Sequence, residues 1–182
     1  YSSLMNISFV ENKIYLKTNS CYSLWVAKDH MKNGYIHLNS DLIFHPGILR
    51  KLLNQNSSAM VVDHVRANED DMVRGKIMKN FIIKINKTTN VNKPDCVIVG
   101  PIYFSKSDVA YLLDELNKEI NCGNITNACY LLFDILLDKI NCIPVFSNGL
   151  FWKEVDTLDD INYVEKTYEI FSKTHKSTKL EP

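Results

Sequence analysis

Apolar runs typical of β-strands alternate with amphipathic helical patterns along almost the whole sequence. After the strand-like run at 35–44, Pro46 stands where a first helical turn tolerates proline, and apolar residues then form one stripe over 48–53. A strand followed by a helix returns at 96–120 and again at 150–171. Such alternation predicts an α/β sheet flanked by helices. One antiparallel excursion is expected around residues 72–104.

Other segments carry weaker local signals. Two β-prone runs at 7–16 surround Glu11-Asn12 and predict a hairpin. Apolar residues at helical spacing predict a helix from Ser20 to Met31, and a β-ribbon is expected over 72–86 with its turn at Lys79-Asn80. Further helices are expected over 105–120, from Thr126 to near Asn141, and from Thr157 onward, followed by a frayed tail at 173–182.

Composition excludes several classes of protein. The 182 residues are 46% hydrophobic, which suits one domain over 1–182 with a sizeable core. The 21 basic and 21 acidic residues balance, so no electrostatic footprint for nucleic acid or an anionic membrane exists. No apolar run approaches the ~20 residues that would span a bilayer. We therefore expect no nucleic-acid partner and no membrane partner.

Cysteine and histidine spacing indicates neither a disulfide framework nor a zinc site. The five cysteines include no C-x-x-C pair, and the five histidines lack ligand spacing. Reduced thiols in a cytoplasmic protein are the expected state. The sequence starts at Tyr1 without a methionine and enters structured-looking sequence at once. This start suggests a fragment or a processed chain.

Two aspartates follow strand-like runs in distant parts of the chain. Asp41 ends the run that begins at Tyr35, and Asp156 ends the run at 150–155. Because ligands gather outside the carboxyl ends of strands in open α/β sheets, the two carboxylates could converge on one hard cation, most simply Mg²⁺ with a phosphate. The alternative is that each aspartate is a turn or helix-cap residue.

Five segments, in the same order along the chain, resemble one known family. They are KTNSCYSLWVA at 17–27, NSDLIF at 39–44, the stretch 71–87 with Ile82, Ile83, Ile85 and Lys87, VGPIYFS at 99–105, and FWKEVDTLDD at 151–160. The chain resembles the nucleotidyltransferases that join a nucleoside triphosphate to a phosphorylated sugar, choline or aminoalcohol. The short T-N-x-x-S-L form is similar to that of phosphocholine and related cytidylyltransferases, so CTP is the favoured nucleotide.

The resemblance implies a fold, a reaction and part of a site. The expected fold is a Rossmann-like mixed sheet flanked by helices, as in nucleotide-diphospho-sugar transferases. The implied reaction is metal-dependent nucleotidyl transfer to a phosphorylated small alcohol, amine or sugar, with release of pyrophosphate. Asp41 and Asp156 would hold Mg²⁺, and Lys87 would contact phosphate as a third catalytic residue. Asn19 and Ser23 would lie near the nucleotide.

Three further residues are candidates for binding the acceptor. Glu154, two residues before Asp156, is expected on the same strand face. Phe133 with Asp134 pairs an aromatic ring with an acid, which would suit an ammonium group through cation–π and Coulomb attraction. The alternative interpretation makes Phe133 a core residue and Asp134 a solvated helix residue. For Lys87 the alternative is a surface hairpin lysine.

One departure from the family pattern bears on activity. The family's opening strand and glycine-rich loop, of the form A-G-x-G-x-R-L, has no counterpart, and only six glycines are present. The resemblance therefore implies an N-terminally truncated domain that is inactive alone. A degenerate binding module without turnover is the main alternative function. A glycosyltransferase with a D-x-D metal site is disfavoured because no D-x-D follows a strand. The acceptor and the oligomeric state stay open.

Overall fold

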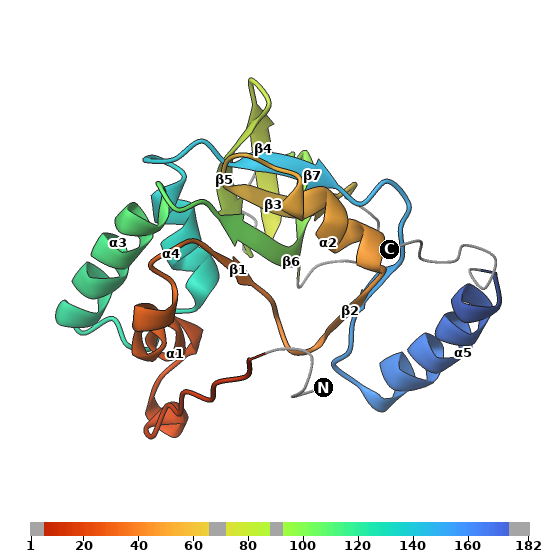
Figure 1. Cartoon of the computed structure of the whole chain (residues 1–182), viewed down its shortest axis with the longest axis horizontal. Helices are drawn as coiled ribbons and strands as arrows, with labels where there is room; N and C mark the ends of the chain where they lie inside the picture. Colours follow the sequence, from red (N-terminus) through yellow and green to blue (C-terminus); the bar gives the residue numbers. More distant parts are fainter. Residues whose placement is uncertain (1–5, 66–71, 88–92, 175–182) are drawn as a thin grey trace.

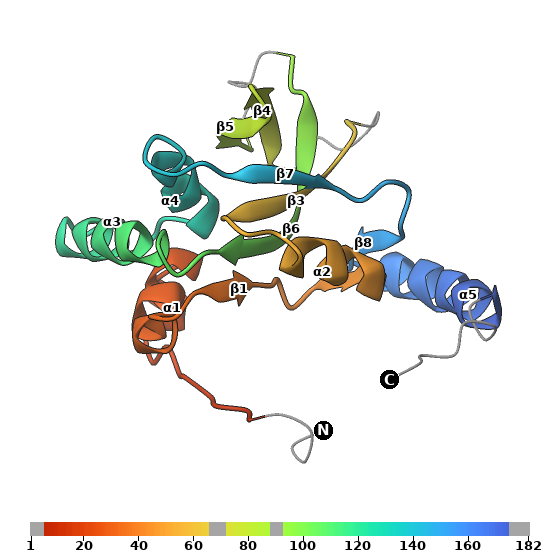
Figure 2. The same ribbon diagram turned by 45° about the horizontal axis from the view of Figure 1, so that its top comes forward.

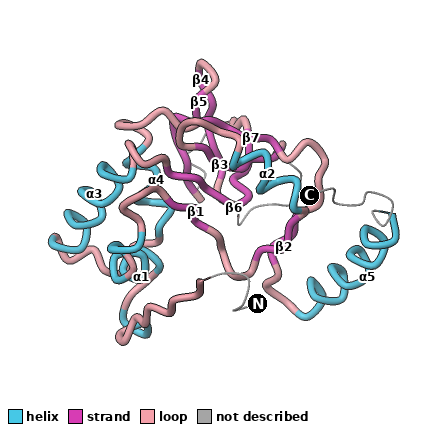
Figure 3. Tube along the Cα trace, in the orientation of Figure 1, coloured by secondary structure: helices cyan, strands magenta, loops and turns pink. Residues whose placement is uncertain are grey.

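A computed structural model describes residues 6–65, 72–87 and 93–174. The helices are α1 (Ser20–Val26), α2 (Pro46–Leu53), α3 (Val109–Asn121), α4 (Cys129–Leu136) and α5 (Leu158–Thr174), with 3-10 turns at Tyr15–Lys17 and Lys28–His30. The strands are β1 (Tyr35–His37), β2 (Leu42–Phe44), β3 (Ala59–Asp63), β4 (Arg74–Met78), β5 (Phe81–Asn86), β6 (Cys96–Phe104), β7 (Ile143–Phe146) and β8 (Trp152–Glu154). Figures 1 and 3 show strands at the centre and helices around them.

Six strands form one mixed sheet in the order β5-β4-β6-β3-β7. Strand β1 also pairs with β6, on the edge opposite β3 that β4 shares. Only the β3–β7 pairing is parallel among the described strands, whereas β4, β5 and β6 form the expected antiparallel excursion. The nine-residue strand β6 pairs with β1, β3 and β4 and is the central strand of the sheet (Figure 2). The fold is the expected mixed α/β sheet with flanking helices.

Residues of β3 alternate between two hydrophobic layers. Met60 and Val62 belong to the layer that includes the buried faces of α1, α3 and α4. Ala59 and Val61 belong to a second layer, where Ile48 and Leu52 of α2 pack. Successive side chains of a strand point to opposite faces, so a strand covered on both sides is apolar throughout. All five residues of β3 are accordingly buried.

A second, two-stranded sheet lies apart from the first. Strands β2 and β8 pair antiparallel, with Leu42 opposite Glu154 and Phe44 opposite Trp152. The run at 35–44, in which a strand was expected to end at Asp41, is therefore divided between two sheets. It leaves β1 after His37 and re-forms as β2 at Leu42.

Local predictions had mixed outcomes. The ribbon at 72–86 is confirmed, and Lys79 and Asn80 take the positive φ values of 50° and 67° that a tight hairpin turn requires. The helix expected over 20–31 ends at Val26 and continues only as a 3-10 turn. The helix expected to run to near Asn141 ends at Leu136.

The hairpin expected at 7–16 is wrong. No strand forms there, and the only regular structure is the 3-10 turn at Tyr15–Lys17. Phe9 is 95% exposed and Leu16 is 84% exposed, so neither run has a core to cover. An isolated two-stranded hairpin is marginal without such a surface.

Two predicted segments fall partly or wholly outside the described residues. The loop expected at 66–71 lies outside them, as does most of the predicted tail, since α5 includes residues 173 and 174. Within the described residues, none of the helices has the length and apolar character needed to cross a membrane.

Candidate active site

The β2–β8 ribbon brings two distant acidic segments together. The backbone N–H of Val155 donates to the carbonyl oxygen of Asp41 at 2.8 Å, one position beyond the Leu42–Glu154 pair. Asp41 therefore lies just before β2, opposite Val155, which lies just after β8. Glu154 is half-buried, while Asp41 and Asp156 are exposed. The ribbon thus presents three carboxylates at one end.

Electrostatics at Glu154 shows that these charges interact. Burial, followed by the negative charges of Asp41 and Asp156, raises the pKa of the Glu154 carboxyl above its ordinary value. The positive charges of Lys87 and Lys153 act in the opposite direction. Lys87, which follows β5, is thus close enough to Glu154 for its charge to act on that carboxyl. The predicted residues Asp41, Glu154, Asp156 and Lys87 form one neighbourhood, which we call the carboxylate cluster.

The donor atoms of the carboxylate cluster suit a hard divalent cation. Burial contributes most to the raised pKa of Glu154, and the charges of Asp41 and Asp156 add to it. Among residues 6–65, 72–87 and 93–174, no three His, Cys, Asp or Glu side chains are already grouped as metal ligands. Mg²⁺ needs few protein ligands, because it keeps several waters and is held by one or two carboxylates plus substrate phosphates. The cluster therefore fits Mg²⁺ bound together with phosphate.

Asp160, at the start of α5, holds the turn that carries Asp156. Its Oδ2 accepts from the backbone N–H of Asp156 at 3.2 Å and of Thr157 at 2.9 Å, and from Thr157 Oγ1 at 2.8 Å. Its Oδ1 pairs with Lys153 Nζ at 2.7 Å. The Lys153 ion pair, followed by the hydrogen bond from Thr157, lowers the pKa of Asp160 far below its ordinary value. Thr157 and Asp160 have the spacing of a capping box in the sequence, but the link to Lys153 is not visible there.

A second contact that sequence reasoning missed ties the ribbon to the main sheet. Trp152 Nε1 donates to Asp63 Oδ2 at 2.7 Å, and Asp63 also accepts from the backbone N–H of His64 at 2.8 Å. Asp63 ends β3 and is only 4% exposed. A buried carboxylate needs such donors, because it loses its hydration. Only an acid at the end of an otherwise apolar strand could have signalled this contact.

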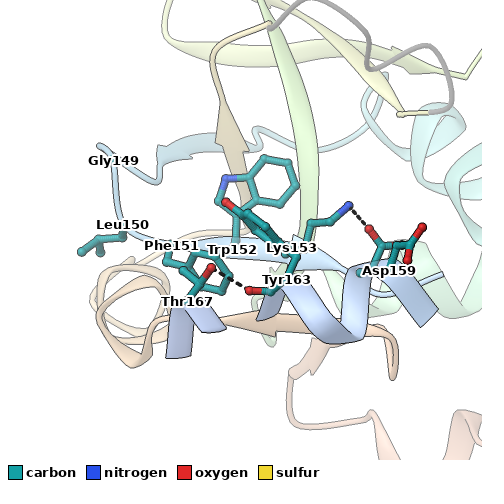
Figure 4. Close-up of a pocket in the computed structure, with 9 residues that line it drawn as sticks. Gly149, Leu150, Phe151, Trp152, Lys153, Asp159, Tyr163 and Thr167 are labelled. Carbon is teal, nitrogen blue, oxygen red and sulfur yellow. Dashed lines mark hydrogen bonds and ion pairs between the residues drawn. The ribbon is translucent and has the colours of Figure 1, made fainter. Parts of the chain in front are cut away.

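A pocket lies beside the carboxylate cluster, between β8 and α5 (Figure 4). It has a volume of about 690 Å³ and is lined by Gly149, Leu150, Phe151, Trp152, Lys153, Asp159, Asp160, Tyr163 and Thr167. Figure 4 shows the Lys153 side chain extended toward the start of α5. None of the three carboxylates of the cluster lines this pocket. We therefore take the cluster, whose charges interact, as the candidate site.

Asn19 and Ser23 lie away from the carboxylate cluster. Both belong to the α1 region, which is separated from the β2–β8 ribbon in Figures 1 and 2. The Asn19 side chain accepts from the backbone N–H of Ser20 and caps α1. Ser23 Oγ accepts from Asn12 Nδ2 at 3.0 Å. Their predicted role near the nucleotide stays a prediction.

Phe133 and Asp134 are engaged with other parts of the fold. Phe133 is 2% exposed and packs against His37 and Phe104, with ring centroids 5.3 and 5.2 Å away. Asp134 forms an ion pair with Lys84 and accepts from the backbone N–H of Ile85 at 2.8 Å. These contacts match the alternative of a core aromatic, and they give Asp134 the role of joining α4 to β5. Acceptor binding by this pair stays a prediction that the contacts do not favour.

Solved structures place the fold among nucleotidyltransferases. The inositol-1-phosphate CTP transferase of T. maritima matches with a TM-score of 0.69 and 18% identity, over 93% of this chain and 67% of that one. The CTP:phosphocholine cytidylyltransferase of Streptococcus pneumoniae matches with a TM-score of 0.74 and 13% identity, over 92% of this chain and 71% of that one. No protein-family model matches the sequence. No curated protein sequence matches it either.

These matches confirm the expected resemblance at the level of the fold. The chain has the nucleotide-diphospho-sugar transferase-like architecture over more than nine tenths of its length. At identities of 18% and 13% the likeness concerns the fold alone. A fold hosts many functions, so the activity must be argued from the site.

Proposed function

We propose that this chain carries the metal-binding part of a nucleotidyltransferase. The reaction is transfer of a nucleotidyl group from a nucleoside triphosphate, with CTP favoured, to a phosphorylated small alcohol, amine or sugar. The observation that carries the proposal is the pairing of β2 with β8, which brings Asp41 beside Glu154 and Asp156. The fold gives further support, and CTP appears in the names of two of the similar structures, while a third is named as a putative glucose-1-phosphate thymidylyltransferase.

The chemistry sets what the site must do. An oxygen of the acceptor phosphate attacks the α-phosphorus, a new phosphoanhydride bond forms, and the bond to the β-phosphate breaks with pyrophosphate leaving. Both reactants are anions, so repulsion is the main obstacle. Bound Mg²⁺ would supply charge neutralisation and alignment of the two phosphates. No side chain has to act as a covalent nucleophile.

Each member of the carboxylate cluster has a role in the proposal. Asp41 and Asp156 provide oxygen ligands to the cation, and their exposure leaves room for phosphate and water. Lys87 offers a positive charge to a phosphate on the same side. Glu154 is less exposed than the two aspartates and orients the acceptor or a bound water. Asn19 and Ser23 are proposed to contact the nucleotide from α1.

The test is release of pyrophosphate with Mg²⁺, using CTP and UTP against phosphocholine, 2-aminoethylphosphonate and glucose 1-phosphate. It is run on this chain and on any longer natural form that contains it. Asp41→Asn and Asp156→Asn should each lower metal-dependent turnover by at least about 100-fold, because each removes an anionic ligand of the cation that would neutralise the transferring phosphate. Asp138→Asn, at another exposed acid, is the matched control. Full activity of either cluster variant at limiting Mg²⁺ would refute the assignment.

A binding module without turnover is the second candidate. In that case CTP with Mg²⁺ would raise the melting temperature while no pyrophosphate appears. The same assay with a thermal-shift arm separates the two functions.

A further inference from the structure

The carboxylate of Asp160 makes more contacts than a helix cap needs. A capping box consists of two reciprocal hydrogen bonds across the first turn. Here Asp160 N–H donates to Thr157 Oγ1 at 3.2 Å, and Thr157 N–H donates to Asp160 Oδ2 at 2.9 Å. Those two contacts complete the box. The contacts with Asp156 N–H and with Lys153 Nζ are additional.

The two additional contacts join β8 and the turn that carries Asp156 to α5. Lys153 belongs to β8, and Asp160 belongs to the first turn of α5. Their ion pair therefore joins the two elements across the turn that holds Asp156. Within the turn, Val155 N–H donates to Asp41, whereas Asp156 N–H and Thr157 N–H both donate to Asp160. The backbone on both sides of the Asp156 side chain is thus constrained.

Both oxygens of Asp160 already accept from protein donors. Oδ1 faces the ammonium of Lys153, and Oδ2 faces three donors of the turn. The side chain is 19% exposed. Coordination of a cation by Asp160 would displace these donors. The contacts of Asp160 are therefore more consistent with an indirect role, in which Asp160 acts on the cation through Asp156.

We propose that Asp160, braced by Lys153, is a positioning residue that holds Asp156 in its metal-binding orientation. The inference rests on the proposed function, since Asp156 is a metal ligand only in that proposal. Groups that orient a metal ligand change metal affinity by roughly 10–100-fold when they are removed.

Binding of Mn²⁺ alone, followed by electron paramagnetic resonance, tests the inference without turnover. Asp160→Asn should weaken Mn²⁺ binding by about 10-fold or more. Thr157→Val is the matched control, because it removes the hydroxyl contacts of Thr157 but leaves the contacts of Asp160 with Lys153 and with the backbone N–H groups of residues 156 and 157. Thr157→Val should change affinity less than about 3-fold, well under the effect of losing a ligand-orienting group.

Lys153→Met separates positioning from simple electrostatics. Lys153 is a positive charge that acts on Glu154, so its removal would strengthen cation binding if charge alone mattered. The positioning role predicts weaker binding instead, because Asp160 loses its brace. Lys153→Met keeps the capping box, so it still tests the positioning role if Asp160→Asn fails to fold.

The outcomes are distinguishable. Weaker Mn²⁺ binding in both Asp160→Asn and Lys153→Met, with Thr157→Val close to the parent protein, supports the inference. Tighter binding in Lys153→Met, or equal loss in Asp160→Asn and Thr157→Val, overturns it and leaves the metal site standing. Absence of Mn²⁺ binding in the parent protein, with CTP present or absent, overturns the metal site and the inference together.

Discussion

Replacing Trp152 with phenylalanine should destabilise the protein more than the same change at Trp25. The two substitutions remove the same atoms. In each case the lost indole N–H donates a hydrogen bond to a residue distant in the sequence. Trp152 donates at 2.7 Å to the carboxylate of Asp63, which is 4% exposed. Trp25 donates at 3.0 Å to the amide oxygen of Asn117. The two acceptors differ in charge and burial, and that difference sets the expected magnitudes.

A hydrogen bond to a charged group contributes about 1.5–3 kcal/mol, and a neutral one about 0.5–1.5 kcal/mol. Trp152→Phe should therefore cost about 1.5–3 kcal/mol, because a buried carboxylate loses a donor. Trp25→Phe should cost about 0.5–1.5 kcal/mol, since Lys28 also donates to the Asn117 oxygen at 3.3 Å. At about 2–4 °C per kcal/mol, Trp152→Phe should lower the Tm by roughly 3–12 °C.

Urea unfolding followed by circular dichroism gives both free energies of unfolding. The chain has two tryptophans, so each variant keeps one as a fluorescent probe of its own region. In Trp25→Phe the remaining probe is Trp152, beside the β2–β8 ribbon. A cost for Trp152→Phe equal to or below that for Trp25→Phe would refute the reasoning from the Asp63 carboxylate. Asp63→Asn, which keeps an oxygen acceptor but removes the charge, should fall between the parent protein and Trp152→Phe.

Three further changes have defined outcomes. Leu132→Ala, at a side chain 1% exposed, should cost about 2–5 kcal/mol in urea unfolding, whereas Leu158→Ala, at 78% exposure, should cost almost nothing. Burial lowers the pKa of His37 below 6.5, so the stability from its neutral form is complete above that pH and is lost as the pH falls below it. The Tm of His37→Gln should accordingly depend less on pH between 7 and 5 than that of a control at exposed His30. Lys79→Gly relieves a φ of 50° and should raise stability by up to about 1 kcal/mol in the same unfolding assay.

The sequence predicted the parts of the fold that depend on local pattern and burial together. The run at 59–65 is β-like in sequence, and β3 forms over Ala59–Asp63 and is buried throughout. The turn at Lys79-Asn80 was also visible, because it interrupts two strand-like runs. The segment 7–16 shows the limit of this reasoning. Its residues suit a strand, yet no partner surface covers Phe9.

The acidic residues of the candidate site could be predicted from the sequence, but the contacts that hold their segments in place could not. Asp41 and Asp156 each follow a strand-like run, which suggested convergence, and β2–β8 pairing places them at one end of a ribbon. The contacts of Asp63 with Trp152 join residues 89 positions apart, and no local pattern reports such a pairing. Phe133 and Asp134 were predicted as a ligand pair because an aromatic ring and an acid are adjacent in the sequence. Adjacency does not show which face of a helix tertiary packing covers, so their burial could not be predicted.

The pairing of Leu42 with Glu154 also determines when the carboxylate cluster can assemble during synthesis. The two residues are 154 − 42 = 112 positions apart. At ~5–20 residues per second, a ribosome adds β8 roughly 6–22 s after β2. Until then β2 has no partner strand, and the nascent chain carries only one half of the proposed cation site. Metal binding as proposed is thus restricted to chains in which every described strand has already been made.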